Sequence, residues 1–263
     1  MFKKIMYAFA VFIFSCGIAA GCACARPVVY QDTLYQVSTI NALMEGVLDG
    51  GETIEGLRHK GDFGIGTFEG LDGEMVGLDG EFYQVKADGK VYQAGDTVKV
   101  PFANVKFFKT NKDFSIDKET YFEHLKEQIY QRMGSKNIFY AVKITGKFSY
   151  VKTRSVPKQE KPYVSLTEAV KSQKVFELRD VEGTVVGFYF PEYVKGVNMP
   201  GFHFHFLTSG KDAGGHVLDC VTRNVIVEID ETNEFDMNVP LNNDFSKADF
   251  SKDNQQALEK AEK

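Results

Sequence analysis

Short strands are predicted over much of the chain, and a few stretches show helical spacing of apolar residues instead. Residues 38–48 place apolar positions at helical spacing behind a Ser or Thr cap, and Gly50-Gly51 ends the stretch. A second helix is predicted over residues 118–133, and brief ones over 165–172 and 254–262. In the second stretch, apolar residues recur every four positions: Tyr121, Leu125, Ile129 and Met133. The pattern therefore predicts few helices.

Strands and turns account for the remaining pattern. Residues 61–93 indicate a meander in which Asp72-Gly73 and Asp79-Gly80 are turns. Further strands are predicted over residues 139–144, 148–151, 175–178, 185–190 and 224–229. Thr145-Gly146-Lys147 would join the first two of these as a hairpin, and Glu182-Gly183 would form another turn.

A polar run at residues 157–162, with a proline at each end, is the clearest linker. It separates two stretches of comparable strand content, so we place a domain boundary there. We expect an N-terminal half at residues 26–160 and a C-terminal half, with a polar tail, at residues 161–263. The expected fold is α/β, of the α+β type. Two sheet-rich halves carry a few flanking helices, with a mixed sheet in the first half and antiparallel strands in the second.

Three of the five histidines, His203, His205 and His216, lie within one short segment. Side chains alternate between the faces of a strand, so His203 and His205 would share one face while the intervening phenylalanines point to the other. Residues 208–215 indicate a hairpin loop, after which an antiparallel strand could bring His216 beside them. Three neutral imidazoles would make an open zinc site, with the fourth position left for water or substrate.

Each of these residues also has a plainer interpretation. A histidine near an apolar strand is commonly a satisfied core or surface residue, and His-x-His pairs arise by chance. The third histidine after a Gly-Gly turn favours the metal site. His59 and His124 lack such partners, and we interpret both as surface residues. Cys220 follows His216 at an even spacing, but a buried free thiol is the preferred account of it.

The first 25 residues have the features of a signal peptide. Lys3 and Lys4 precede an apolar run, and Ala23-Cys24-Ala25 has the small-x-small form of a cleavage site. We therefore expect an exported protein, secreted or in the cell envelope. Cys22 offers an alternative, because residues 19–22 resemble a lipoprotein cleavage box that would leave this cysteine acylated. Release is favoured, since an alanine stands where a larger aliphatic residue is usual. A membrane anchor is a third option, but the apolar run is shorter than the roughly 20 residues that span a bilayer.

Cysteine content indicates how the chain is stabilised, and net charge indicates which class of ligand it does not suit. Cleavage after Ala25 would leave Cys220 alone, so stability has to come from burial rather than from an intramolecular disulfide. The 23 Phe and 12 Tyr supply apolar area for that burial. The formal net charge is −5, and loss of the two leader lysines makes it more negative. An acidic protein of this kind is a poor candidate for binding nucleic acid.

A short duplication places two glutamates in equivalent contexts. Residues 70–74 recur as residues 77–81, and two successive turns explain the repeat. Because the offset is odd, an unbroken strand would direct Glu74 and Glu81 to opposite faces. At most one of them would enter a shared site, and spacing alone does not say which.

Several longer motifs resemble the bacterial alpha-acetolactate decarboxylase family. They cover residues 61–68, 71–74, 79–84, 152–163, 201–206 and 214–219, in order and over nearly the whole mature chain. Three histidines hold zinc in that family, and they correspond here to His203, His205 and His216. The C-terminal half would then be the zinc-binding one.

The resemblance also implies the other residues of the site. It selects Glu74 rather than Glu81 as the carboxylate near the metal and adds Thr67 and Arg154. By themselves these three would be taken for a turn acid, a strand-face hydroxyl and a linker charge. A glutamate of the tail is implied as well, with Glu262 as the best match and Glu259 as a close alternative.

The implied activity is the zinc-dependent decarboxylation of (S)-2-acetolactate to (R)-acetoin and carbon dioxide, in acetoin and butanediol metabolism. The metal would act as a Lewis acid that stabilises an enediolate. Family analogy also implies a homodimer. Two other classes stay open: a zinc hydrolase, and a non-catalytic metal-binding protein of the cell envelope.

Overall fold

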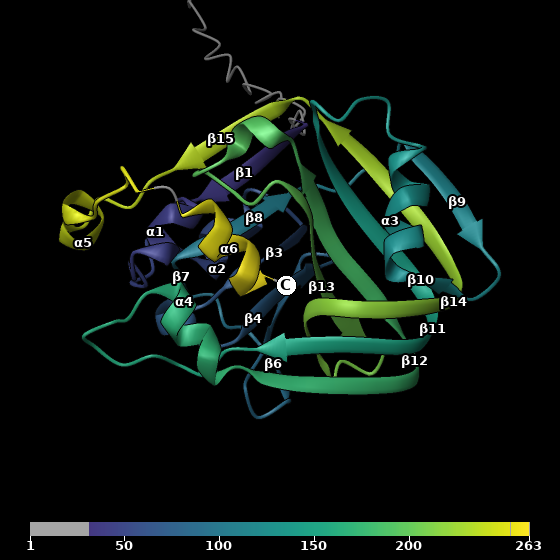
Figure 1. The fold of residues 1–263 in the computed structure, drawn as a ribbon, viewed down its shortest axis with the longest axis horizontal. Helices are drawn as coiled ribbons and strands as arrows, with labels where there is room; N and C mark the ends of the chain where they lie inside the picture. The colour runs from purple at the N-terminus through teal and green to yellow at the C-terminus, as the bar shows by residue number, and fades with distance from the viewer. Residues whose placement is uncertain (1–31, 253, 263) are drawn as a thin grey trace, which may run out of the picture. The chain divides into compact units, whose positions relative to one another are not determined.

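Two β-sheets dominate the computed structural model, which describes residues 32–252 and 254–262 (Figure 1). The first sheet consists of β1 (Thr33–Val37), β3 (Phe63–Thr67), β4 (Glu74–Leu78), β5 (Glu81–Val85), β6 (Val91–Gln93), β8 (Phe102–Lys106) and β15 (Glu234–Asn238). Its strand order is β15-β1-β8-β3-β4-β5-β6. β15 and β1 run parallel and the other neighbours antiparallel, so the sheet is mixed, as expected. A separate short pair joins β2 (Glu52–Thr53) to β7 (Lys99–Val100).

The predicted meander of the first sheet is confirmed. β3, β4, β5 and β6 all lie within residues 61–93, and the turns fall at the two Asp-Gly pairs. Asp79 and Gly80 both have positive φ angles, 54° and 79°, as a tight hairpin turn of this kind requires. Gly73 has a φ of 86°, and a Cβ there would lie 2.3 Å from the carbonyl oxygen of Val85. Glycine is therefore needed at this turn both for its conformation and for space.

The second sheet contains the longest strands of the described residues. Its strands are β9 (Lys112–Ile116), β10 (Thr120–Tyr121), β11 (Phe139–Ser155), β12 (Lys174–Phe190), β13 (Gly201–Thr208) and β14 (Gly214–Thr232), of which β11, β12 and β14 are the longest. The order is β10-β14-β11-β12-β13, with β9 also paired to β14, and every pair is antiparallel. β14 pairs with β13 as well as with β11, so β11, β12, β13 and β14 form a closed ring of pairings.

The predicted turns at residues 145–147 and 182–183 are wrong, because β11 and β12 run through them without a break. Gly146 and Gly183 lie opposite each other in the register of these two strands. A Cβ on Gly146 would lie 2.3 Å from the carbonyl oxygen of Asn224, and one on Gly183 would lie 2.5 Å from that of Leu207. These glycines permit close approach of neighbouring backbones within a continuous strand, which is a second reason for glycine in a strand pattern.

The two predicted halves do not coincide with the two sheets. The residues that the structure describes form one compact unit, and β9, β10 and β11 belong to the second sheet although they precede residue 160. β15 follows the linker in sequence but pairs with β1 in the first sheet. Residues 157–162 connect β11 to α4 (Leu166–Ala169). The predicted signal peptide, residues 1–25, lies outside the described residues.

The helices are short; those that begin at residues 40, 122, 166 and 255 lie near predicted positions, whereas the two at residues 54–58 and 243–247 were not predicted. Besides α4 they are α1 (Ile40–Met44), α2 (Ile54–Arg58), α3 (Phe122–Tyr130), α5 (Asn243–Lys247) and α6 (Gln255–Glu262), with 3₁₀ turns η1 (Glu69–Leu71), η2 (Val170–Ser172) and η3 (Glu192–Val194). The Thr39 side chain accepts a hydrogen bond from the Ala42 amide and so caps α1. α3 begins later than predicted, because Thr120–Tyr121 pairs with β14. Within the described part of the chain, no helix has the length and apolar character needed to cross a membrane.

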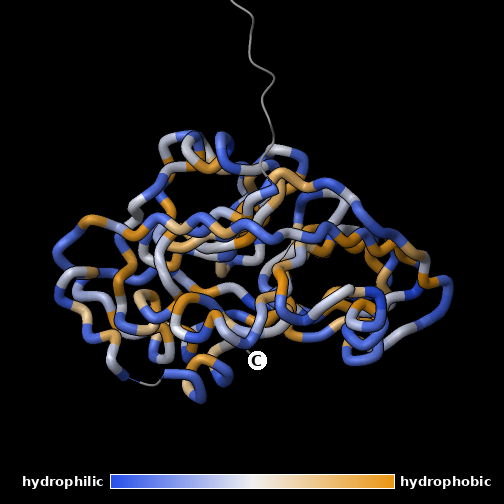
Figure 2. The backbone as a smooth tube through the Cα atoms, turned by 90° about the horizontal axis from the view of Figure 1, so that it is seen from above, coloured by the Kyte–Doolittle hydropathy of each residue, from blue (hydrophilic) through white to orange (hydrophobic). Residues whose placement is uncertain are grey.

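Side-chain alternation divides each sheet into two packing faces. On β8, Ala103 and Val105 pack on the face covered by α2, whereas Phe102, Asn104 and Lys106 point to the other face. Between the sheets, residues such as Phe63 and Ile65 meet Phe188 of β12. A further core lies between the second sheet and α3. Figure 2 shows that projecting loops are mostly hydrophilic, consistent with this burial of the apolar strand positions.

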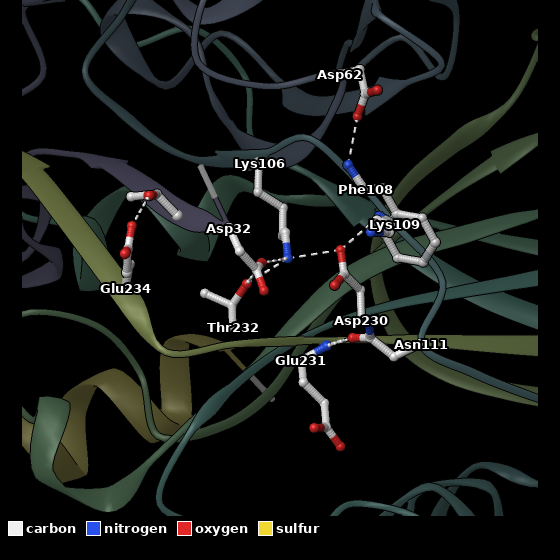
Figure 3. A network of polar contacts seen from close by, with 11 residues as sticks. Asp32, Asp62, Lys106, Phe108, Lys109, Asn111, Asp230, Glu231, Thr232 and Glu234 are labelled. Atoms are coloured by element: carbon white, nitrogen blue, oxygen red, sulfur yellow. Dashed lines mark hydrogen bonds and ion pairs between the residues drawn. The ribbon is translucent and has the colours of Figure 1, made fainter. Parts of the chain in front are cut away.

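Lys106 is the centre of a buried polar network that joins the two sheets (Figure 3). Its Nζ lies 2.7 Å from Asp230 Oδ2 and 2.8 Å from Asp32 Oδ1, and it also contacts the Thr232 hydroxyl. The side chains of Lys106 and Asp230 are both 1% exposed. The Lys109 amide donates to the same Asp230 oxygen at 2.7 Å. A cation from β8 is thus neutralised by carboxylates on both sides, which satisfies charges that would be costly to bury alone.

We expect Lys106→Met to lower the free energy of unfolding by about 3–5 kcal/mol, because Asp230 would be left as an uncompensated buried charge. Urea unfolding followed by circular dichroism measures the change. The double variant Lys106→Met/Asp230→Leu should recover much of the loss, since the carboxylate that then lacks Lys106, that of Asp32, is 57% exposed and can be solvated. Lys171→Met is the control, because Lys171 pairs with Glu168 on the surface. Equal stability of Lys106→Met and Lys171→Met would contradict the prediction.

Candidate functional site

His203 and His205 project from β13 into a cavity between the sheets. β13 pairs with β12, where His203 lies opposite Phe188 and His205 opposite Val186. Phe204 packs into the core of the second sheet, together with the neighbouring phenylalanines, while both histidines line the cavity on the opposite face. The predicted division of this strand into a phenylalanine face and a histidine face is confirmed.

His216 joins them from the start of β14, as the predicted hairpin requires. The register places His216 opposite His205 on one side and opposite Arg154 on the other. His203 Nε2 lies 3.1 Å from His216 Nδ1. A Cβ on Gly214 would lie 2.3 Å from the Phe206 carbonyl oxygen, and one on Gly215 would lie 2.5 Å from that of Arg154. The Gly-Gly pair therefore lets β14 fit between β13 and β11.

The three imidazoles fit a metal ion. Their candidate ligand atoms all lie within 4.8 Å of one another, and all three residues are buried. His205 Nδ1 lies 2.7 Å from the Met75 carbonyl oxygen, which accepts its proton and leaves Nε2 with a lone pair. This Nε2 is buried and makes no hydrogen bond to any described residue. An oriented imidazole with an unused nitrogen is what a metal site requires.

Burial keeps His203 and His205 neutral, which is the form that binds a metal. Desolvation, followed by the charge of Arg154, lowers the pKa of His203 to about 3. Desolvation also lowers the pKa of His205 well below its ordinary value, with a further contribution from His203. Protons therefore do not compete for the ring nitrogens near neutral pH.

Glu74 and Arg154 form a buried ion pair beside the histidines. Glu74 comes from β4 of the first sheet and Arg154 from β11 of the second. Arg154 Nη1 donates to Glu74 Oε1 at 2.9 Å, and Glu74 Oε2 lies 3.7 Å from His205 Nε2. The two side chains are only 4% and 8% exposed. The pair thus connects the two sheets at the cavity and places a guanidinium and a carboxylate next to the histidines.

Thr67 lies opposite Glu74 in the register of β3 and β4 and lines the same cavity. Its hydroxyl donates to the Gly73 carbonyl oxygen at 2.7 Å, so the oxygen lone pairs are left to accept a hydrogen bond. Glu81 lies elsewhere, at the start of β5, where it pairs with Arg58 at 3.0 Å. The choice of Glu74 over Glu81 implied by the family resemblance agrees with these positions.

Of the two glutamates predicted from the tail, the structure describes the side chain of Glu259 but not that of Glu262. Glu262 is the last residue of α6, and its side chain lies outside what the structure describes. Glu259 is exposed on the same helix, where it accepts a hydrogen bond from Gln255. Leu258 and Ala261 are buried in a cluster with residues that line the cavity. α6 therefore packs directly behind the cavity wall.

The apolar side of the cavity was not predicted. It consists of Ile40, Leu43, Leu71, Phe102, Val156 and Leu166. They come from distant parts of the chain, and in sequence each resembles an ordinary core residue, so no local pattern marks them. His59 and His124 are exposed, as expected. Cys220 is a buried free thiol, as predicted, and burial raises its pKa far above the ordinary value.

Known proteins resemble this chain over nearly its whole described length. Residues 34–252 match the family model described as alpha-acetolactate decarboxylase. The alpha-acetolactate decarboxylase of Methanosarcina mazei is 50% identical over 233 residues, which cover 89% of this chain and 81% of that protein. The Bacillus subtilis protein of the same name is 41% identical over 225 residues, or 84% and 88% of the two chains.

A solved structure agrees with these sequence matches. The crystal structure of alpha-acetolactate decarboxylase from Bacillus subtilis strain 168 matches with a TM-score of 0.86 at 39% identity, covering 88% of this chain and 99% of that one. The range matched by the family model contains Thr67, Glu74, Arg154 and the three histidines and ends before α6.

Proposed function

Because the chain belongs to the alpha-acetolactate decarboxylase family, we propose that its cavity converts (S)-2-acetolactate to (R)-acetoin and carbon dioxide with the help of zinc. His203, His205 and His216 would hold the metal. The observation that carries this proposal is the meeting of three buried imidazoles with a buried arginine–glutamate pair in one cavity.

The substrate explains why such a site is needed. Carbon 2 of acetolactate bears a carboxylate, a hydroxyl, a methyl and an acetyl group. Loss of carbon dioxide breaks the bond to the carboxylate and leaves its electron pair on carbon 2, conjugated with the ketone as an enediolate. The developing negative charge is the barrier. When bound, zinc supplies Lewis acidity for this charge, and three neutral ligands leave its double positive charge largely uncompensated.

Arg154 supplies a second positive charge at the cavity. Its guanidinium can donate to the leaving carboxylate or to the oxygens of the enediolate, and such charge-assisted hydrogen bonds strengthen as the charge develops. Glu74 holds one edge of the guanidinium through the 2.9 Å contact to Nη1. The group is therefore oriented before the substrate arrives, which avoids a cost of reorganisation during the reaction.

A carboxylic acid has to deliver a proton to carbon 2 once the carboxylate has left. Glu74 and Glu262 are the candidates, and delivery from one side makes the acetoin chiral. Thr67 can accept a hydrogen bond from the substrate hydroxyl at the same wall and so orient the substrate. Burial of the cavity keeps bulk water away from the enediolate, which would otherwise be protonated on either face.

We expect His205→Ala to lose both bound zinc and carbon dioxide release from acetolactate, because two imidazoles remain where three are needed. Elemental analysis of the purified protein and a colour assay for acetoin provide the two measurements. His124→Ala is the control, since His124 is exposed on α3. Acetoin production by zinc-free His205→Ala at the wild-type rate would contradict the proposed mechanism.

The same acetoin assay on the wild-type protein separates the alternative functions. A protein that cleaves esters or amides and makes no acetoin would be a zinc hydrolase. A protein that shows neither activity would be a non-catalytic metal-binding protein.

Arg154→Lys keeps the positive charge beside Glu74 but loses the planar fork of donors. We expect kcat to fall by about 100-fold, as is typical when a positioning contact is displaced, while zinc stays bound. Arg223→Lys is the matched control, because Arg223 forms exposed ion pairs on the second sheet. An unchanged kcat in Arg154→Lys would remove this residue from the site.

Export from the cytoplasm and a homodimeric state are further proposals. The first rests on the leader-like residues 1–25, and the second on family analogy. Native mass spectrometry of the protein from its source cells tests both. A subunit that begins at Arg26 would support soluble export, and an acylated Cys22 would indicate a lipid anchor. An intact leader would contradict soluble export as well as the lipid anchor. The mass of the assembly gives the number of subunits, and any value other than two contradicts the homodimer.

A further inference from the structure

The cavity has two chemically different sides. His203, His205, His216, Arg154, Glu74 and Thr67 form a polar side. The rest of the lining includes six buried hydrocarbon side chains that pack together in one cluster, and Leu43 and Leu166 among them are each 4% exposed. A ligand that fills this space has to place its oxygens toward one side and its hydrocarbon toward the other, because a buried polar group without a partner is costly.

The substitution pattern of a 2-hydroxy-3-oxo acid matches this division. Three groups on carbon 2, the carboxylate, the hydroxyl and the acetyl ketone, carry oxygen and need the polar side. The fourth group is an alkyl chain, which is a methyl in acetolactate. Once the three oxygen-bearing groups are placed, the alkyl chain is left to face the hydrocarbon side chains.

Leu43 and Leu166 lie on helices rather than on sheet strands, as does Ile40 of α1, and Leu71 lies in the 3₁₀ turn η1. Phe102 is part of β8, and Val156 directly follows β11, so both are fixed by the sheets. Leu43 lies on α1 and Leu166 on α4, and these helices belong to neither sheet. Behind them, Leu258 of α6 is buried in the same cluster. A leucine shortened at either position therefore leaves space in the cavity without disturbing the strands that carry the histidines.

We propose that Leu43 and Leu166 set the upper size limit for the alkyl group on carbon 2 of the substrate. The site then takes 2-alkyl-2-hydroxy-3-oxo acids with short chains and discriminates by chain length. This inference rests on the proposed decarboxylase function, because it assumes that the carboxylate, hydroxyl and ketone occupy the polar side.

The test compares kcat/KM for the methyl, ethyl and propyl homologues in the zinc-loaded enzyme. We expect wild type to prefer methyl over propyl by at least about 10-fold, the discrimination available from steric limits on one or two methylenes. Leu166→Ala removes three carbons, enough space for a propyl group, and should raise the propyl-to-methyl ratio by about 10-fold. Leu43→Ala should shift it in the same direction. Leu57→Ala is the matched control, a buried leucine on α2 outside the cavity.

Inhibition provides a readout that needs no turnover of the competing molecule. Saturated 2-hydroxy-2-alkyl acids lack the ketone and do not decarboxylate, so their inhibition constants report fit alone. The propyl acid should bind Leu166→Ala about 10-fold more tightly than wild type, relative to the methyl acid. If Leu166→Ala does not fold, Leu166→Val gives the same comparison with a smaller cavity.

The outcomes separate this inference from the proposed function. A wild-type enzyme that makes no acetoin overturns the function itself. If acetoin is made but wild type accepts propyl as well as methyl, the size limit does not exist. If wild type discriminates and both leucine variants keep the wild-type ratio, the limit lies with other residues and the assignment to Leu43 and Leu166 is wrong.

Discussion

Insertion of the first residues of β14 between β13 and β11 is the constraint on which the site depends. His216 is paired with His205 of β13 on one side and with Arg154 of β11 on the other. The start of β14 therefore adds a third imidazole and aligns it with the guanidinium of β11. Backbone pairing at this spacing leaves no room for a Cβ at Gly214 or Gly215. The histidines are therefore positioned by the hydrogen-bond ladder of the sheet rather than by a flexible loop. Metal binding and catalysis both require side chains that are held rigidly in this way.

The layer that packs on the inner face of the first sheet is mostly apolar, with three polar regions among the described residues. One polar region is the site, where Glu74 of the first sheet meets Arg154 of the second. The second is an amide cluster in which Asn198 donates to Gln36 and Asn104, at 2.7 and 3.0 Å. The third is the Lys106 network. The amide cluster and the Lys106 network pair their buried donors and charges internally, and such contacts specify the relative positions of the packed elements more strictly than a purely apolar layer would.

Sequence patterns predicted those parts of the fold whose causes are local. The alternation of histidine and phenylalanine on β13, the Asp-Gly turns of the meander and the threonine cap of α1 all depend on residues a few positions apart. The errors at Gly146 and Gly183 have the opposite cause. Glycine favours turns and also permits close strand approach, and which applies depends on strands that are distant in sequence. The assignment of β9, β10 and β11 to the second sheet is likewise non-local.

By itself, the sequence determined that two histidines share a strand face, that a third follows a glycine turn, and that an acidic, phenylalanine-rich chain has to be stabilised by burial. The family resemblance added Thr67, Glu74 and Arg154, which no local rule selects. Only the tertiary structure decided that these residues meet, because Glu74 and Arg154 are brought to 2.9 Å by the packing of one sheet on another. It alone also decided which hydrocarbon side chains face the cavity, since burial marks a residue as apolar but does not say what it touches.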